Sequence, residues 1–392
     1  MPPPTAARIY LDHNATAPLA AEAREAVLRC LEAPPGNPSS THRSGQEARA
    51  VVEEARQQIA SEAGASPEEV VFVSGGTEAD NLALRGVMTA RSLRDGRRHL
   101  LVSAVEHPAV LETAHSLAES GYEVDVVPVD GSGRVDPAAL EQRLRPDTAM
   151  VSIMAANHET GILQPVTSIA RLLRPRGITF HIDAVQALPH APVSLESTGA
   201  DLLSFSAHKL GGPKGIGALL IREGVPFVSP MTGGAQQGRR RAGTESPELC
   251  AGFSAAVVNL RRRPDRVRAL RDRLELELSR RVSGATVLCA GVDRLPNTSC
   301  VQFRGLPAQS LVVAFDLEGL AVSHGAACAS GMSRPSHVLK AMGLSDIEAR
   351  SCIRFSLGAG TTAAEIDQAV NIVERVTARM LRVTGERLEA RA

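Results

Sequence analysis

The chain contains no tryptophan and only two tyrosines, Tyr10 and Tyr122, among its 392 residues. Proteins that bind single-stranded nucleic acid stack bases on aromatic side chains, so this composition argues against such a platform. The 43 basic residues balance the 43 acidic ones, and a net charge of zero gives no reason to expect binding to nucleic acid or to a membrane surface. We therefore expect neither partner.

Long apolar runs and paired cysteines are also missing. No stretch approaches the roughly 18 apolar residues of a membrane span, and the first residues contain no apolar core of a signal peptide. Scattered cysteines without a CxxC pair are typical of free thiols in a reducing compartment. The six cysteines are Cys30, Cys250, Cys289, Cys300, Cys328 and Cys352. We therefore expect a cytoplasmic protein, and we expect no metal site.

Lysine is scarce, because only Lys209, Lys214 and Lys340 stand against forty arginines. Arginine can replace lysine in many charged roles, but not where a primary amine must form an imine. Each lysine is therefore a candidate for such chemistry. Lys209 directly follows an apolar run, whereas Lys214 and Lys340 lie in loop or helix contexts typical of surface lysines.

Between about residues 70 and 221, short apolar runs alternate with segments of helical spacing. This alternation predicts an α/β fold with a mostly parallel, seven-stranded sheet covered on both faces. The expected strands are Glu69–Val73, His99–Val105, Tyr122–Val129, Ala149–Ala155, Ile178–Asp183, Asp201–Ser206 and Gly217–Ile221.

After about residue 250 the pattern changes to amphipathic helices separated by short apolar runs. One helix is expected from Asp265 to about Val282, and a capping box at Thr362 opens a last one. Strands are expected at Ser299–Phe303, Leu311–Phe315 and Ile353–Leu357. We therefore expect a large domain of residues 19–250 and a smaller α+β domain of residues 1–18 and 251–392.

Several expected strands end in polar residues, and open α/β sheets bind ligands at the carboxyl ends of their strands. The turn Ser74–Thr77 could present N–H groups to an anion at a helix N-terminus. Asp183 ends an apolar strand, where a carboxylate is costly to bury without a cation. An imine-forming Lys209, this turn and Asp183 together suit pyridoxal 5'-phosphate (PLP), with His107 as a partner that stacks on the ring.

The chain resembles the NifS/IscS-like cysteine desulfurases of the class V aminotransferase family, which are fold-type I PLP enzymes. The matching segments run in family order over nearly the whole chain. They are Tyr10–Thr16, Gly36–Ser40, Ser74–Asn81, Glu106–His107, Asp183–Gln186, Ser204–Lys209, Gly212–Gly217, Arg241–Thr244, Ser323–Cys328 and Arg354–Gly358.

The resemblance implies a catalytic set. Lys209 would carry PLP as an imine and transfer protons, with His107 stacked on the ring and assisting. Cys328 would accept the sulfur of L-cysteine; it lies among small residues typical of a mobile exposed loop, whereas the other five cysteines are expected to be buried thiols. Arg354 would pair with the substrate carboxylate as a planar bidentate donor.

The resemblance also implies the cofactor contacts. Asp183 would face the pyridine nitrogen, and Gln186 the phenolic oxygen. Thr244 would reach the phosphate from the neighbouring subunit, so a homodimer is implied. The remaining phosphate contacts are Gly76, Thr77, Ser206 and His208.

Three features depart from the family pattern. Asn157-His158-Glu159 stands where the family often has Asn-Asn-Glu, so the residue near the cofactor oxygen is His158 by position or Asn157 by type, and Asn157 is also a candidate for substrate binding. Gln236-Gln237 replaces Gln-Glu, which weakens an acidic role there. The short C-terminus puts an iron–sulfur destination in doubt, because some members dock a scaffold protein through a longer tail.

The expected activity is L-cysteine desulfuration, which gives L-alanine and a Cys328 persulfide for an acceptor protein or a small thiol. The alternatives are a selenocysteine lyase, another class V β-eliminating enzyme, or a non-catalytic sulfur-transfer subunit, and the intact Lys209, Asp183 and Cys328 argue against the last. The sequence does not name the acceptor, because iron–sulfur assembly, tRNA thiolation, DNA phosphorothioation and specialised biosynthesis all use such persulfides.

Overall fold

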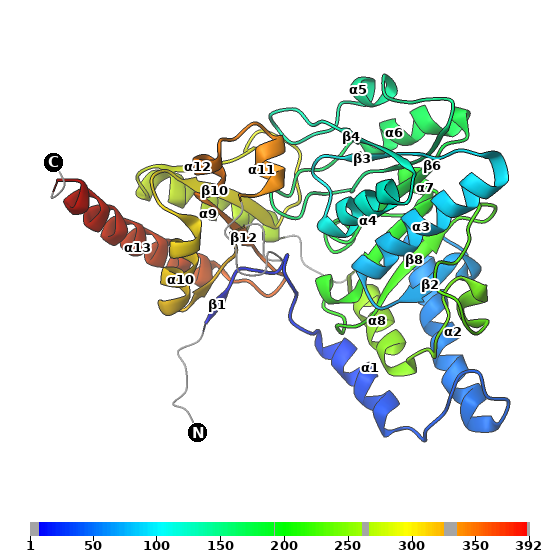
Figure 1. Cartoon of the computed structure of the whole chain (residues 1–392). Coiled ribbons are helices and arrows are strands. Elements are labelled where there is room, and N and C mark those ends of the chain that lie inside the picture. The colour runs from blue at the N-terminus through cyan, green and yellow to red at the C-terminus, as the bar shows by residue number, and fades with distance from the viewer. Residues whose placement is uncertain (1–7, 192, 261–265, 325–334, 390–392) are drawn as a thin grey trace.

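The computed structural model describes residues 8–191, 193–260, 266–324 and 335–389, with side chains as far as residue 383. Figure 1 shows two groups of elements, each built around its own sheets. The larger group holds a seven-stranded sheet, and the smaller one holds a three-stranded and a two-stranded sheet. Within the described ranges, no helix has the length and apolar character that crossing a membrane requires.

The seven-stranded sheet has the strand order β2-β8-β7-β6-β5-β3-β4. β8 runs antiparallel to both of its neighbours, and every other pair is parallel. The predicted mostly parallel sheet of seven strands is therefore confirmed. The strands are β2 (Val70–Val73), β3 (His99–Ser103), β4 (Glu123–Val127), β5 (Thr148–Ser152), β6 (Thr179–Asp183), β7 (Leu202–Ser206) and β8 (Gly217–Ile221).

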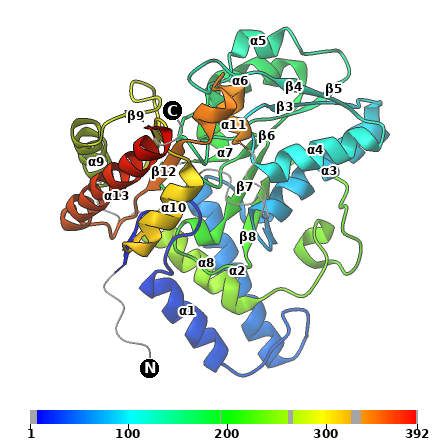
Figure 2. The ribbon, with the colours of Figure 1, turned by 60° about the vertical axis from the view of Figure 1, so that its left-hand side comes forward.

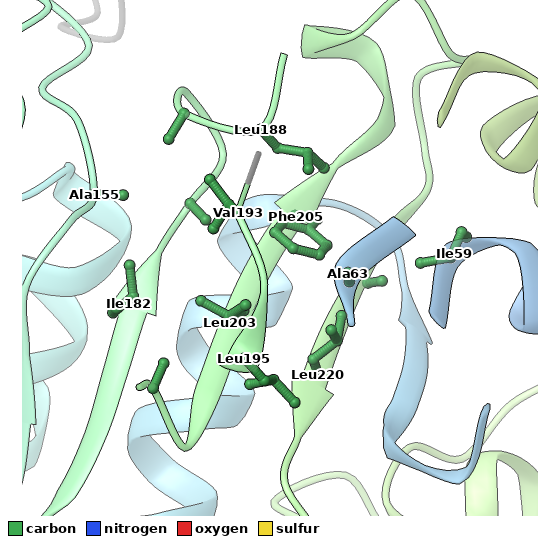
Figure 3. Packing of buried hydrophobic residues seen from close by; sticks show 14 of the residues in the cluster. Ile59, Ala63, Ala155, Ile182, Leu188, Val193, Leu195, Leu203, Phe205 and Leu220 are labelled. Atoms are coloured by element: carbon green, nitrogen blue, oxygen red, sulfur yellow. The ribbon is translucent and has the colours of Figure 1, made fainter. Parts of the chain in front are cut away.

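The two faces of this sheet pack against different helices, because successive strand residues point in opposite directions. Ile182 and Leu203 lie in one apolar cluster with residues of α2 (Arg43–Ala63), as Figure 3 shows. On the opposite face, Leu202 packs with residues of α3 (Gly76–Asp95). Polar residues that alternate with Ile182 and Leu203 consequently face α3.

The other helices of the larger group surround this sheet. Phe253 and Val257 of α8 belong to the same buried cluster as Ile182, so we propose that the boundary between the two domains follows α8, slightly beyond residue 250. The helices are α1 (Ala21–Glu32), α4 (Pro108–Glu119), α5 (Pro137–Glu141), α6 (Val166–Leu173), α7 (Leu195–Thr198) and α8 (Pro247–Asn259). The 3₁₀ segments are η1 (Pro67–Glu69), η2 (Arg174–Arg176), η3 (Ala207–Lys209) and η4 (Gln236–Arg239).

The smaller group has a separate apolar core formed by both ends of the chain. Its antiparallel sheet has the order β12-β10-β9, and β1 pairs in parallel with β11. Figures 1 and 2 both show α13 beside α9 and α10. The elements are β1 (Ile9–Tyr10), α9 (Val267–Arg281), β9 (Ala285–Val287), β10 (Thr298–Phe303), α10 (Ala308–Leu317), β11 (Leu320–Ala321), α11 (His337–Ala341), α12 (Asp346–Ala349), β12 (Cys352–Ser356) and α13 (Ala363–Glu389).

One predicted strand is wrong. The run Leu311–Phe315 lies inside helix α10. Leu311 and Phe315 are fully buried while Val313 is 57% exposed, which is helical spacing, since a strand would place all three on one face. An apolar run of this length does not by itself distinguish a strand from a buried helix face.

The prediction of buried cysteines holds for Cys250, Cys300 and Cys352 and is wrong for two others. Cys30 and Cys289 are only half-buried. Cys30 lies on α1, which packs on the rim of the larger group rather than in its centre.

Candidate active site

Polar side chains gather where the parallel strands of the large sheet end. Lys209 lies in η3, directly after β7, and its Nζ donates hydrogen bonds to the carbonyl oxygens of Asn14 (2.5 Å) and Ala15 (3.0 Å). The loop after β1 thus closes over this edge of the sheet. A cleft of about 1120 Å³ borders Lys209 and Gln186 and extends to Gly358 of the smaller group.

Asp183 is the last residue of β6 and is 7% exposed. Burial raises the pKa of its carboxyl to about 6, against the lowering effects of the Val185 N–H, which donates to Oδ1 at 2.9 Å, and of the Lys209 charge. Asp183 is therefore an anion at neutral pH. Gln186 follows it and donates from Nε2 to the same Asn14 carbonyl at 3.0 Å.

The turn before α3 lies against the ends of β6 and β7. A Cβ placed on Gly76 would come within 2.8 Å of Val185 Cγ2 and 3.7 Å of Ser206 Cβ, so only glycine leaves this space open. Thr77 is exposed in the first turn of α3, whose free N–H groups favour an anion. Gly76, Thr77 and Ser206 are thus brought together, as the sequence predicts for a phosphate site.

His208 follows Ser206 by two residues, in the 3₁₀ segment η3. Its Nδ1 is 3.2 Å from the hydroxyl of Thr16. Burial, followed by the charges of Lys209 and Lys214, lowers the pKa of His208 to about 4. A neutral His208 can therefore offer an N–H to an anion but no full charge.

Two imidazoles face each other beyond the end of β3. The rings of His107 and His158 make an edge contact, with centroids 5.3 Å apart and planes at 73°. His107 caps α4, and its Nδ1 accepts the Ala109 N–H at 3.1 Å, so Nε2 carries the ring proton. Burial and the Lys209 charge lower the pKa of His107 to about 4, and burial holds that of His158 well below its usual value. Both rings are neutral at physiological pH.

Asn157 and His158 differ in whether their side chains have hydrogen-bonding atoms left for a ligand. The Asn157 amide donates to the Val105 carbonyl at 3.0 Å, and its Oδ1 accepts the N–H groups of Glu159 (2.9 Å) and Thr160 (3.0 Å). The hydrogen bonds of the Asn157 side chain are thus used to hold the turn together. His158 Nδ1 is buried and has no hydrogen-bond partner within the described residues, which favours His158 as the residue that meets a ligand.

Arg354 reaches the site from β12 in the smaller group. One guanidinium nitrogen donates to Asp12 Oδ1 at 2.7 Å, and another donates to the His158 carbonyl at 2.9 Å. Its Nε is buried and unpartnered in the described part of the chain. A buried guanidinium with an unused donor is suited to binding the carboxylate of a ligand. Arg354 would then bind this carboxylate and Asp12 at the same time.

Two predicted residues are not part of this cluster. Thr244 is exposed between η4 and α8, and no hydrogen bond among the described residues joins it to Lys209 or Asp183. Cys328 lies outside the described residues. On either side of it, Ser323 pairs with Arg354 through backbone hydrogen bonds, and the Ser336 hydroxyl donates to Glu159 Oε2 at 2.6 Å.

Asn14 is a central residue to which the sequence analysis assigned no role. Its carbonyl accepts from Lys209 and Gln186, and its Nδ2 donates to the His158 carbonyl at 3.2 Å. Its Oδ1 accepts from Asn297 at 2.9 Å, which joins the site to the smaller group. The available signal was its position inside the matching segment Tyr10–Thr16.

Glu106 is a second such residue and is fully buried at the end of β3. The Ser103 hydroxyl and the Met154 N–H both donate to its Oε1, the latter at 2.8 Å. Burial raises the pKa of Glu106 to about 8, despite these two donors. The sequence signal was its position beside His107, but burial of the carboxyl is a tertiary property.

Comparison with known proteins agrees with this geometry. The profile of the Aminotransferase class-V family matches residues 9–369. A cysteine desulfurase of Cereibacter sphaeroides is 46% identical over 369 residues, which are 93% of this chain and 95% of that protein. A solved NifS-like protein superposes with a TM-score of 0.87 at 35% identity, covering 95% of this chain and 99% of that one.

A further solved structure, described as SspA in complex with cysteine, superposes with a TM-score of 0.81 at 31% identity. The superposition covers 90% of this chain and 99% of that one. The likeness thus extends over nearly the full length in sequence and in structure, and the chain belongs to the class-V aminotransferase family.

Proposed function

We propose that the chain is a PLP-dependent L-cysteine desulfurase. The observation that carries this proposal is the position of Lys209, whose amine lies at the carboxyl edge of the large sheet within the electrostatic reach of the buried Asp183 carboxylate. The relative named a cysteine desulfurase and the neighbour solved with cysteine support the reaction and the substrate.

The residues present fit PLP. Gly76 leaves space beside Ser206 at a helix N-terminus for a phosphate, and Asp183 supplies an anion for a protonated pyridine nitrogen. The buried, unpartnered Nδ1 of His158 supplies a polar contact for a ring substituent. Lys209, Asp183, Gly76, Thr77, Gln186, Ser206, His208 and His158 would hold the cofactor.

When bound, PLP supplies an electron sink that lets the substrate Cα lose its proton. Lys209 would take that proton on its amine. Arg354 would orient L-cysteine through its carboxylate, with the Nε donor that the structure leaves unused. His107 would cover the ring and present its Nε2 proton to the reacting side.

Cys328 would complete the sulfur transfer. Its thiolate attacks the substrate sulfur, a new S–S bond forms, and the C–S bond breaks with its electrons left on the carbon skeleton. Protonation of that carbon gives L-alanine, and Cys328 keeps the sulfur as a persulfide. An acceptor protein or a small thiol then removes this sulfur.

The proposed function is tested by incubating the purified protein with PLP and L-cysteine and measuring alanine. We expect one alanine for each sulfur released to a thiol, with one additional sulfur on the peptide that holds Cys328 when no thiol is present. Sulfide release that survives in Cys328→Ser, or a strong preference for selenocysteine over cysteine, would support the lyase alternative instead.

We also propose a homodimer in which Thr244 completes the phosphate site of the partner subunit. Thr244 is exposed, and its loop is braced because Arg241 Nε lies 2.8 Å from Glu78 Oε1 at the start of α3. Mixing Lys209→Ala chains with Thr244→Ala chains would regenerate one intact site in mixed dimers. Activity that rises on mixing supports this arrangement, and a strictly additive result contradicts it.

A further inference from the structure

A row of polar side chains crosses the α3 face of the large sheet beneath the candidate active site. His181 of β6 is fully buried, with Nδ1 2.8 Å from the Ser152 hydroxyl of β5 and Nε2 2.9 Å from the Ser204 hydroxyl of β7. His181 and Ser204 alternate along their strands with the apolar Ile182 and Leu203, which Figure 3 shows in the cluster that includes residues of α2. Burying such groups is costly unless every one is satisfied.

Asp80 of α3 packs against this row from the helix that covers the sheet. It is 1% exposed, and its Oδ1 lies 3.6 Å from His181 Nε2. This oxygen has no hydrogen-bond partner among the described residues. Asp80 begins the second turn of α3, four residues after Gly76, so the same helix serves both the phosphate turn and this row.

Asp183 belongs to the same face, because it follows His181 by two residues and lies opposite Ser204 in the β6–β7 register. Two carboxyl groups are therefore buried on the same face of the sheet, near enough for the Asp183 charge to act on Asp80. Burial and the charge of Asp183 raise the pKa of Asp80 well above its usual value, whereas the Val185 N–H and Lys209 limit the rise for Asp183. Like charges in such a pair do not both ionise.

The other titratable groups around the pair do not remove this conflict. Burial lowers the pKa of His181 to about 3, so the ring is neutral and gives no compensating charge. Glu106, beyond the end of β3, adds a further acidic group to the surroundings of Asp80. Lys209 lies at the strand ends and acts on Asp183.

We propose that Asp80 and His181 are positioning residues for Asp183: Asp80 holds a proton directed at the His181–Ser204 pair, and Asp183 is the anion of the two carboxyl groups. The Ser204 hydroxyl hydrogen-bonds Asp80 and partly offsets its raised pKa, but burial and the Asp183 charge outweigh this contact. A neutral Asp80 removes the repulsion that would otherwise neutralise Asp183. The benefit to PLP rests on the proposed function, but the protonation of Asp80 does not.

Infrared spectroscopy of the cofactor-free protein, labelled with carboxyl-¹³C aspartate, tests the protonation directly. At neutral pH we expect a carbonyl stretch of a protonated aspartate that disappears in Asp80→Asn and persists in Asp183→Asn. A band that disappears in Asp183→Asn but not in Asp80→Asn would overturn the proposal. Because no cofactor is present, this result is independent of whether the chain uses PLP.

A second measurement separates positioning from a structural role. Asp80→Asn copies the neutral acid, so PLP affinity should stay within about threefold of wild type, and the absorbance of bound PLP should titrate at an unchanged pH. Asp80→Ala removes the buried polar partner of Ser204, so we expect roughly tenfold weaker PLP binding and a shifted titration.

Asp201→Asn serves as the matched control, because Asp201 precedes β7 at the opposite end of the strand and its Oδ2 accepts the Phe180 N–H. This variant should change stability without changing the PLP titration. A tenfold loss of PLP affinity in Asp80→Asn would show that Asp80 acts as an anion. An unshifted titration in Asp80→Ala would reduce Asp80 to a structural residue.

Discussion

The two sheet regions contribute different kinds of residue to the candidate site. The seven-stranded sheet contributes Lys209 and Asp183 at the ends of adjacent strands, where each is placed by its own strand and by nearby backbone groups. The three-stranded sheet contributes Arg354 from within β12, where Asp12, 342 residues away in sequence, and the His158 carbonyl hold it. The first region presents its groups at strand ends, with the Lys209 amine also held by the Asn14 and Ala15 carbonyls of the loop after β1, whereas the second presents Arg354 from the middle of a strand.

This difference separates cofactor chemistry from substrate recognition in the proposed enzyme. Strand-end groups are positioned once the large sheet has formed. Within the smaller group, Arg354 is held by Asp12 of the loop after β1, and its position is complete only when this group docks against the His158 carbonyl of the larger one. Changes in the first region should therefore remove cofactor chemistry, whereas changes in the second should act on the substrate while PLP stays bound.

Lys209→Ala gives the largest expected effect. Borohydride should then attach no PLP to the protein, because Lys214 is exposed on the loop between β7 and β8 and Lys340 lies on α11 of the smaller group. Mass spectrometry of the reduced protein measures this, with Lys214→Ala as the control that still retains the adduct. A PLP adduct recovered on Lys214 would contradict the assignment of the first region.

Cys328→Ser should separate cofactor chemistry from sulfur transfer. A serine hydroxyl supplies almost no nucleophile at neutral pH, so alanine production should fall by roughly 10³-fold or more. PLP should remain bound, and L-cysteine should still change the absorption spectrum. Cys289→Ser, a half-buried thiol elsewhere in the same region, should keep wild-type turnover. Near-normal alanine production by Cys328→Ser would refute the persulfide step.

Arg354→Ala should weaken L-cysteine binding while PLP occupancy survives. Charge-assisted hydrogen bonds to a carboxylate are worth about 1.5–3 kcal/mol, so KM should rise roughly 10- to 100-fold. Arg354→Lys keeps the charge but loses the planar fork, and an intermediate KM is expected. Loss of PLP with an unchanged KM would mean that Arg354 holds the cofactor, as the residues of the large sheet do, and does not bind the substrate.

The last prediction concerns the stability of the larger group rather than activity. The folded chain binds a proton at Glu106 up to a pKa of about 8, against a usual value of 4.5. The resulting stabilisation is complete below about pH 4.5 and is lost as pH rises through about 8. The free energy of unfolding should therefore fall with pH, by as much as about 5 kcal/mol from this one group.

Glu106→Gln keeps the shape of the side chain and cannot ionise. Urea unfolding of the cofactor-free protein at several pH values should show a shallower decline for this variant than for wild type. Parallel pH profiles for the two proteins would mean that Glu106 is charged in the folded state.

The sequence predicted the larger group better than the smaller one. All seven strands of the large sheet were expected, because each is an apolar run bounded by turn residues. In the smaller group the run Leu311–Phe315 was predicted to be a strand and is a helix. The prediction was wrong because five consecutive apolar residues show neither the strand period nor the helix period. Asn14 and Glu106 received no role, because their importance lies in partners that are distant in sequence.

The sequence by itself determined which residues are candidates for chemistry, because a rare lysine, a glycine turn and a carboxylate at strand ends follow from composition and local pattern. Tertiary structure alone decided the protonation states of these side chains and the residues that surround them. Burial between α3 and the large sheet raises the pKa of both Asp80 and Asp183. Packing of the two regions brings Arg354 to Asp12 and His158. The reason is physical, since desolvation and pairing depend on what surrounds a group in space, and chain order does not specify those surroundings.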